Sequence, residues 1–220
     1  MGLAIFDLDN TLIGGDSDHA WGEYLVQRGC VDGELFRSEN DRFYREYQRG
    51  KLDIRAYLEF ALEPLARIPR AELEALHADF MREVISDFWL PRAEELVQGH
   101  RERGHHTMII TATNHFVVHP IAQKLGVDSL LATDPEKLDG AYTGRVEGTP
   151  CFREGKVQRL QAWLQQHPQF SAVEHWFYSD SANDLPLLDQ VTYPVAVDPD
   201  DDLRQAAGER GWPIISLRDG

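Results

Sequence analysis

The sequence has few cysteines, a shortage of basic residues and no long apolar run. Its two cysteines, Cys30 and Cys151, stand far apart and form no CxxC pair, which argues against a disulfide framework and against a zinc knuckle. Lys and Arg number 22 against 37 Asp and Glu, which leaves a net charge of −15. Because nucleic-acid backbones are bound by clustered Lys and Arg, no nucleic-acid partner is expected. No apolar stretch approaches the roughly 18 residues that a membrane span needs, so no membrane partner is expected either.

The amino terminus lacks the features of a secretory signal. The apolar residues 3–6 are followed at once by Asp7 and Asp9, where a signal peptide would continue its apolar stretch after a basic start. Together with the unpaired cysteines, this favours a reducing cytoplasm. The sequence does not distinguish a monomer from a homodimer.

Short apolar runs alternate with amphipathic stretches along most of the chain. The runs have the character of strands buried on both faces and cover residues 3–6, 107–110, 175–178, 194–197 and 213–217. Helix-like spacing of apolar residues falls between most of them, at residues 91–103, 116–125, 156–165 and 202–209. This alternation predicts an α/β fold with a doubly wound, Rossmann-like parallel sheet. Ligands of such sheets bind beyond the carboxyl ends of the strands.

Two segments interrupt the alternation. Residues 15–90 contain no convincing strand and several amphipathic stretches, at residues 17–28, 34–49, 53–65 and 69–86. We expect a helical insertion there, which leaves residues 1–14 and 91–220 as the α/β core. The second interruption is residues 130–148, where Asp139-Gly140 separates two strand-like stretches and predicts an antiparallel hairpin.

Acidic residues stand at the ends of two predicted strands. Asp7 and Asp9 follow the first strand two residues apart, so their side chains point the same way. Asp180 and Asp184 follow the strand at 175–178. Carboxylates that converge at one edge repel one another unless a cation lies between them, and Mg²⁺ prefers oxygen ligands of this kind. The sequence therefore predicts a Mg²⁺ site.

Two further residues suit a phosphate group. Thr111 is expected where the second strand gives way to a helix, so its hydroxyl and the neighbouring N–H groups could bind an anion. Lys156 follows Gly155 at a predicted helix start and could balance both the acidic residues and a phosphate.

The order of these motifs resembles the haloacid dehalogenase superfamily of Mg²⁺-dependent phosphatases. Residues 7–12 match its first motif, residues 111–114 the second, Lys156 the third and residues 180–184 the fourth. The helical insertion after the first motif resembles the cap of the subgroup that contains phosphoserine phosphatases and histidinol-phosphate phosphatase-like enzymes. The resemblance implies that Asp7 attacks phosphorus to form an aspartyl phosphate, and that Asp9 acts as general acid and base.

The resemblance also implies the ligands of the metal and of the phosphoryl group. Mg²⁺ would be held by Asp7, the backbone carbonyl of Asp9, Asp180 and Asp184. Residues that would hold the phosphoryl group and the substrate are Asn10, through its amide, Thr111, Ala112, Lys156 and Asn183.

The leaving group is inferred from departures from the phosphoserine phosphatase pattern. Those enzymes carry Ser-Gly-Gly where this chain has Thr-Ala-Thr at residues 111–113, and a Glu after the first motif where this chain offers Asp16 and Asp18. The acidic residues favour a small cationic amino-alcohol phosphate, with histidinol phosphate as the specific expectation and Asp18 as the partner of its ammonium group. Trp21, Tyr44 or Tyr47 could stack on an imidazole ring. Phosphoserine and other small amino-alcohol or sugar phosphates are the alternatives.

Two other classes of function share parts of this pattern. A phosphomutase would use Asp7 and Asp9 but keep water away from the aspartyl phosphate. A non-catalytic, phosphate-sensing module resembling a receiver domain would need Asp7 and the metal, yet it would have no use for the proton-handling Asp9. The histidines at 115 and 119 are four residues apart, but the Glu of an H-E-x-x-H zinc motif is missing between them.

Overall fold

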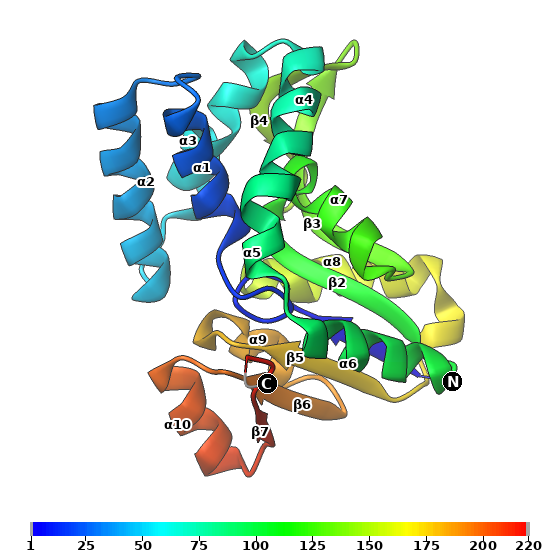
Figure 1. The fold of residues 1–220 in the computed structure, drawn as a ribbon. Coiled ribbons are helices and arrows are strands. Elements are labelled where there is room, and N and C mark those ends of the chain that lie inside the picture. Colours follow the sequence, from blue (N-terminus) through cyan, green and yellow to red (C-terminus); the bar gives the residue numbers. More distant parts are fainter. Residues whose placement is uncertain (1, 219–220) are drawn as a thin grey trace.

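The fold is built on a seven-stranded sheet with the order β4-β3-β2-β1-β5-β6-β7 (Figure 1). The structure is a computed structural model and describes residues 2–218. The central strand β1 pairs in parallel with β2 on one side and with β5 on the other. The strands are β1 (Leu3–Phe6), β2 (His106–Asn114), β3 (Ser129–Leu138), β4 (Ala141–Glu147), β5 (His175–Ser179), β6 (Tyr193–Val197) and β7 (Ile214–Ile215).

Helices cover both faces of the sheet because the central strand is apolar on both faces. Ala4 and Phe6 belong to a core cluster shared with α6 (Pro91–Glu102) and α7 (His115–Leu125). Leu3 and Ile5 belong to a second cluster on the other face. The second cluster is shared with α8 (Glu154–Gln166), α9 (Leu185–Leu188) and α10 (Asp201–Arg210). The expected doubly wound α/β fold is therefore confirmed.

Residues 15–90, called the helical insertion below, run from the end of the first motif to α6. They form α1 (Ser17–Gln27), α2 (Gly33–Gln48), α3 (Ile54–Arg67), α4 (Arg70–Phe80), a π-helical turn (Met81–Ile85) and the short α5 (Ser86–Phe88). The N-cap residues of the first three helices are Asp16, Asp32 and Asp53, whose carboxylates accept N–H groups of the first turn. The stretch at 69–86, expected as one helix, is thus interrupted by a π-helical turn.

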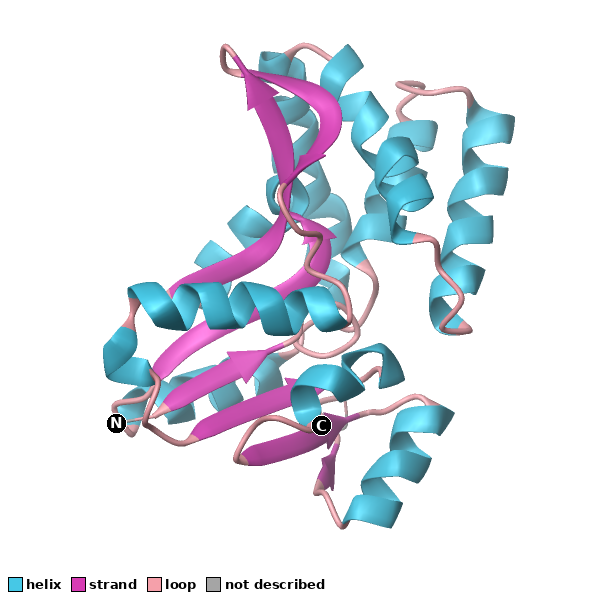
Figure 2. Ribbon diagram, turned by 180° about the vertical axis from the view of Figure 1, so that it is seen from behind, coloured by secondary structure: helices cyan, strands magenta, loops and turns pink. Residues whose placement is uncertain are grey.

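The predicted hairpin is present and connects the sheet to the helical insertion (Figure 2). Asp139 and Gly140 have φ of 51° and 84°, which is the backbone of a two-residue hairpin turn. The hairpin packs against α3, with Gly144 so close that a Cβ placed there would lie 3.4 Å from Cβ of Ala66. The beginning of β3 pairs in parallel with β2, so this segment also adds a strand to the core sheet that the sequence pattern did not reveal.

The extents of two strands, β2 and β7, differ from the expectation. β2 continues beyond the predicted 107–110 to Asn114, with an irregular register after Ile110, and the Asn114 side chain caps α7. Thr111 therefore lies inside β2 and not at a helix start. β7 is confined to Ile214–Ile215, within the expected 213–217. Among the described residues, no helix is both long and apolar enough to cross a membrane.

Candidate active site

Asp7 and Lys156 form the buried centre of the site. Asp7 directly follows β1, and Lys156 lies in the first turn of α8. The Lys156 Nζ atom is 2.8 Å from Oδ1 of Asp7 and 2.7 Å from Oδ2 of Asp184. Burial raises the pKa of Asp7 to about 7, although Lys156 opposes this rise. Burial disfavours the charge of Lys156, but Asp184 and Asp7 outweigh that effect and raise its pKa. One buried cation thus serves two carboxylates.

Thr11 brings Asp180 to the same place. Its hydroxyl oxygen lies 3.3 Å from Oδ2 of Asp7 and 3.1 Å from Oδ1 of Asp180, and it accepts the N–H of Asp180 at 3.0 Å. A hydroxyl has one proton, so it can donate to only one of the two carboxylates at a time. Burial, Asp7 and Asp184 raise the pKa of Asp180 well above its usual value. The buried Asp7 and Asp184 share one lysine, and the half-buried Asp180 lies beside them, which is a donor set and charge deficit that suit a divalent cation.

Asp9 is held by hydrogen bonds from two different elements. Its Oδ1 accepts the N–H of Ser17 at 2.6 Å, and its Oδ2 accepts the hydroxyl of Thr113 at 2.7 Å. Burial and the nearby Asp16 raise the pKa of Asp9 to about 6, while the two hydrogen bonds lower it. A carboxyl group that titrates near neutral pH can both give and take a proton, as a general acid and base must.

The remaining residues expected to hold the phosphoryl group have different surroundings. The Thr111 hydroxyl accepts the N–H of Thr113 at 3.3 Å, and Ala112 follows it along the cavity wall. The backbone N–H of Asn10 donates to the carbonyl of Gly15 at 3.0 Å, so this amide is used within the turn. The carbonyl of Asn10 accepts a guanidinium N–H of Arg218 at 2.8 Å.

Asn183 faces the helical insertion. Its Oδ1 accepts Nε–H of Arg153 at 3.1 Å, and its Nδ2 donates to the carbonyl of Tyr47 at 3.3 Å and to the Ser181 hydroxyl at 3.1 Å. The same arginine donates to the carbonyl of Gly50. The site therefore connects the core to the end of α2.

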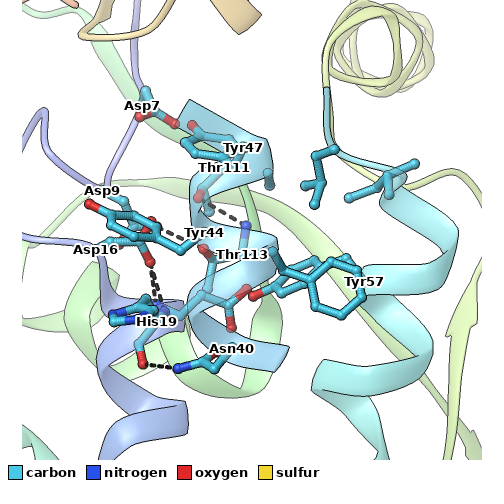
Figure 3. Close-up of a pocket in the computed structure, with 15 residues that line it drawn as sticks. Asp7, Asp9, Asp16, His19, Asn40, Tyr44, Tyr47, Tyr57, Thr111 and Thr113 are labelled. Carbon is cyan, nitrogen blue, oxygen red and sulfur yellow. Dashed lines mark hydrogen bonds between the residues drawn. The ribbon is translucent and has the colours of Figure 1, made fainter. Parts of the chain in front are cut away.

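A cavity extends from Asp7 into the helical insertion (Figure 3). The cavity has a volume of about 50 Å³, which is room for only a few waters. Room for a metabolite-sized molecule would require the helical insertion or the lining side chains to move. None of the described residues that line this cavity is Lys or Arg. The lining residues are Asp7, Asp9, Asp16, Asp18, His19, Asn40, Phe43, Tyr44, Tyr47, Leu52, Ile54, Tyr57, Thr111, Ala112 and Thr113.

The end of the cavity inside the helical insertion is acidic. Asp16 caps α1 by accepting the N–H groups of Asp18 and His19 at 3.0 and 2.8 Å. Asp18 accepts the side-chain N–H of Asn114 at 3.2 Å and is also hydrogen-bonded to the Tyr57 hydroxyl. Burial raises the pKa of Asp16 to about 6 and that of Asp18 to about 7. A bound cation would stabilise the ionised form of both carboxylates.

Aromatic rings form the walls of this end. Tyr44 stacks on His19 with ring centroids 4.6 Å apart, and Tyr47 and Tyr57 also line the cavity (Figure 3). Trp21, named with Tyr44 and Tyr47 as a stacking partner, is buried among apolar residues of the helical insertion instead, with Phe80 5.2 Å away. Tyr57 was not predicted to belong to the site, because no local signal indicates which face of a helix in the insertion meets the site.

Thr113 and Arg153 were also missed as parts of the site. Thr113 lies two residues after Thr111 in the same strand, so the alternation of side chains along β2 could have placed it beside Thr111. Arg153 precedes α8 in a loop, and only the folded chain brings it to Asn183.

Comparison with known proteins places these residues in context. Residues 4–189 match the haloacid dehalogenase-like hydrolase family. The chain is 47% identical to the histidinol-phosphatase of Neisseria meningitidis, over 98% of this chain and 99% of that protein. It is 34% identical to phosphoserine phosphatase SerB1 of Mycobacterium tuberculosis, over 98% of this chain and 70% of that protein.

Solved structures show the same fold. A Bordetella pertussis protein of unknown function has a TM-score of 0.91 and 46% identity, with 98% of both chains covered. A phosphoserine phosphatase structure, solved as an analogue of its phospho-aspartyl intermediate, has a TM-score of 0.71 at 21% identity over 99% of this chain and 93% of that chain. The motif-bearing residues lie at the carboxyl end of the sheet, the family match spans most of the chain, and this protein therefore belongs to the haloacid dehalogenase-like hydrolases.

Proposed function

We propose that this protein is a Mg²⁺-dependent phosphatase that hydrolyses histidinol phosphate through an aspartyl phosphate on Asp7. The observation that carries the substrate assignment is the composition of the cavity, which offers carboxylates and aromatic rings but no Lys or Arg among its described lining residues. The 47% identity to the histidinol-phosphatase of Neisseria meningitidis supports the same assignment.

The chemistry of the two candidate leaving groups differs in charge. Histidinol carries an ammonium group and an imidazole ring and has no carboxylate. Asp16 and Asp18 can pair with the ammonium group, and the tyrosine rings that line the cavity can stack on the imidazole. Serine adds a carboxylate, which would meet these two acidic residues with no Lys or Arg among the described lining residues and with His19 as the basic side chain at hand. Electrostatics therefore favours histidinol over serine as the leaving group.

Asp7, Asp180 and Asp184, together with the Asp9 carbonyl, are the residues proposed to hold Mg²⁺. Among the described residues, Lys156 is the cationic partner of Asp7 and Asp184, and burial together with the neighbouring carboxylates raises the pKa values of Asp7 and Asp180. When bound, Mg²⁺ would neutralise charge on the phosphoryl group and on the carboxylates around it.

The residues of this chain would divide the reaction into two steps. Asp7 attacks phosphorus while Asp9 gives a proton to the departing alcohol oxygen, which leaves the phosphoryl group on Asp7. Asp9 then takes a proton from water as that water attacks phosphorus, which restores both side chains. Lys156 holds Asp7 in place from a distance of 2.8 Å, and its charge also favours the phosphoryl oxygens.

The helical insertion is the proposed cap of this active site. Residues 15–90 would close over the α/β core formed by residues 1–14 and 91–220, and thereby exclude water while the aspartyl phosphate forms.

The cysteines Cys30 and Cys151 are free thiols, and a reducing cytoplasm is the proposed location.

A substrate comparison tests the proposal. Phosphate release is measured from histidinol phosphate, phosphoserine and a set of sugar phosphates, with Mg²⁺ and with excess EDTA. We expect histidinol phosphate to have the highest kcat/KM and EDTA to abolish activity. Preference for phosphoserine would refute the substrate assignment, and transfer of phosphate between sugar carbons would indicate a phosphomutase. No turnover of any ester by folded protein with Mg²⁺ would refute the phosphatase itself.

A further inference from the structure

Arg153 has a backbone conformation that side chains normally avoid. It immediately precedes α8, three residues before Lys156, with φ of 50° and ψ of −120°. Glycine adopts such a conformation readily, whereas a residue with a Cβ is strained in it. An arginine in this place indicates that its side chain makes interactions that a glycine would lose.

Those interactions cross from the core to the helical insertion. The Arg153 Nη2 atom donates to the carbonyl of Gly50 at 2.5 Å, just after the end of α2, while Nε donates to Oδ1 of Asn183 at 3.1 Å. The planar guanidinium group can make both bonds at once because its donors are fixed in a fork. Gly50 itself has φ of 63°, and a Cβ placed there would lie 3.1 Å from the same Nη2 atom. The absence of a side chain at residue 50 leaves room for this approach.

Asn183 makes a second connection to the same turn. Its Nδ2 atom donates to the carbonyl of Tyr47 at 3.3 Å, and its Oδ1 atom receives the bond from Arg153. A carbonyl can only accept and a guanidinium can only donate, so these two partners together fix which way the amide of Asn183 points. Its Nδ2 atom also donates to the Ser181 hydroxyl at 3.1 Å, so the core residues Arg153 and Ser181 orient the amide, and the end of α2 adds one further contact to it.

We infer that Arg153 is a positioning residue that latches the helical insertion onto the core and orients the amide of Asn183 when the cavity is closed. The inference rests on the proposed function and on the role that the family resemblance implies for Asn183, which is to hold a phosphoryl oxygen. When the insertion moves away, Arg153 loses the Gly50 carbonyl and Asn183 loses the Tyr47 carbonyl, while Asn183 keeps its core contacts to Arg153 and Ser181. Closure therefore adds a contact that holds the amide of Asn183 while the substrate is enclosed, and loss of the latch lowers the population of the closed state.

The test compares R153G with the wild type. Glycine removes the side chain and also relieves the backbone strain, so folding should not suffer. R159A is the matched control, because Arg159 lies on α8, the helix that Arg153 precedes, but pairs with Asp134 of the hairpin and not with the insertion. R153K provides a single donor in place of the fork and should restore only part of the function.

Two measurements decide the outcome. If the closed state falls to about a tenth of its population, KM for histidinol phosphate rises about tenfold in R153G with a smaller change in kcat, and R159A stays at the wild-type value. Hydrogen–deuterium exchange of residues 44–53 should become faster in R153G and stay unchanged in R159A, while exchange in β1 and β2 is the same in all variants.

Three results would overturn the latch. The first is unchanged exchange at residues 44–53 in R153G. The second is a fall in kcat with unchanged KM and exchange, which would make Arg153 a direct phosphate ligand. The third is a similar effect of R159A. The exchange measurement uses the protein without substrate, so it tests the latch even if histidinol phosphate is not hydrolysed. A failure to hydrolyse histidinol phosphate would contradict the proposed function alone.

Discussion

Replacing Asp18 with Asn tests whether the acidic end of the cavity destabilises the folded protein. Burial raises the pKa of Asp18 from 3.8 to about 7. The folded protein therefore binds this proton more tightly than the unfolded chain, and stability decreases as the pH rises from about 4 to about 7. The full shift corresponds to ~4 kcal/mol at 1.36 kcal/mol per pKa unit. Because Asp18 faces a cavity that admits water, we expect about half of that amount, on the order of 2 kcal/mol.

The substitution suits the purpose because it keeps the shape and most partners of the side chain. The Asn carbonyl oxygen can still accept the N–H of Asn114, and the Asn amide can donate to the Tyr57 hydroxyl. D53N provides the control, since Asp53 caps α3 from an exposed position and does not line the cavity. Burial lowers the pKa of His100 to about 4, which makes stability rise with pH between about 4 and 6.5, but this contribution is the same in every variant.

The assay is urea-induced unfolding of metal-free protein at several pH values from 4 to 8.5. We expect D18N to gain stability over the wild type progressively between pH 4 and 7, and to keep a constant advantage above pH 7.5. At the same time KM for histidinol phosphate should rise by at least about tenfold, because the ammonium group loses a charged partner. A gain that is independent of pH, or a loss of stability at pH 8, would show that burial of the Asp18 charge is not what destabilises the fold.

Three further substitutions test the reacting groups. D9N should reduce kcat/KM for histidinol phosphate by about 10²–10⁴ but spare kcat/KM for p-nitrophenyl phosphate, whose good leaving group needs no proton. kcat should fall for both esters because Asp9 also takes the proton from water, and equal losses of kcat/KM would contradict the acid role of Asp9. T113V removes the hydrogen bond that lowers the pKa of Asp9, so the alkaline limb of the plot of kcat/KM against pH should move to higher pH. If the alkaline limb does not move, it reports the titration of a group other than Asp9. K156M leaves Asp7 and Asp184 without their cation, so turnover should fall by about 10²–10³ and unfolding should occur at a lower urea concentration. Unchanged turnover would show that Lys156 has only a structural role.

The parts of the fold that could be predicted are those encoded by neighbouring residues. β1 was located to the residue because four apolar side chains are followed at once by Asp7. The hairpin turn was recognised from Asp139-Gly140, whose positive φ values require such residues. The acidic residues at the strand ends converge because parallel strands end at the same edge of a sheet, so the proximity of Asp7 and Asp180 follows from topology. Lys156 reaches the same place from the first turn of α8.

The parts that could not be predicted depend on contacts between distant segments. The parallel beginning of β3 is defined by its pairing with β2, and the sequence around Ser129 also suits a hairpin arm. β2 extends past Thr111 because Asn114 pairs with Thr133, and nothing in the local sequence indicates that pairing. Trp21 and Tyr57 lie on amphipathic helices, and spacing alone does not tell which side chain meets the cavity and which meets the core of the insertion.

In the proposed function, the two ends of the cavity take positive charge from different sources, and this asymmetry would select the substrate. At the reacting end, Lys156 partly balances the carboxylates and a divalent cation would complete the balance. At the far end, Asp16 and Asp18 have His19 but no Lys or Arg beside them among the described lining residues, so a cationic leaving group would supply the charge that is missing there. A phosphate ester with an ammonium group in the leaving alcohol satisfies both ends, whereas one with a carboxylate would be repelled at the far end. The selection therefore works by excluding anionic leaving groups as much as by binding a cationic one, and a single basic residue placed beside Asp18 would weaken it.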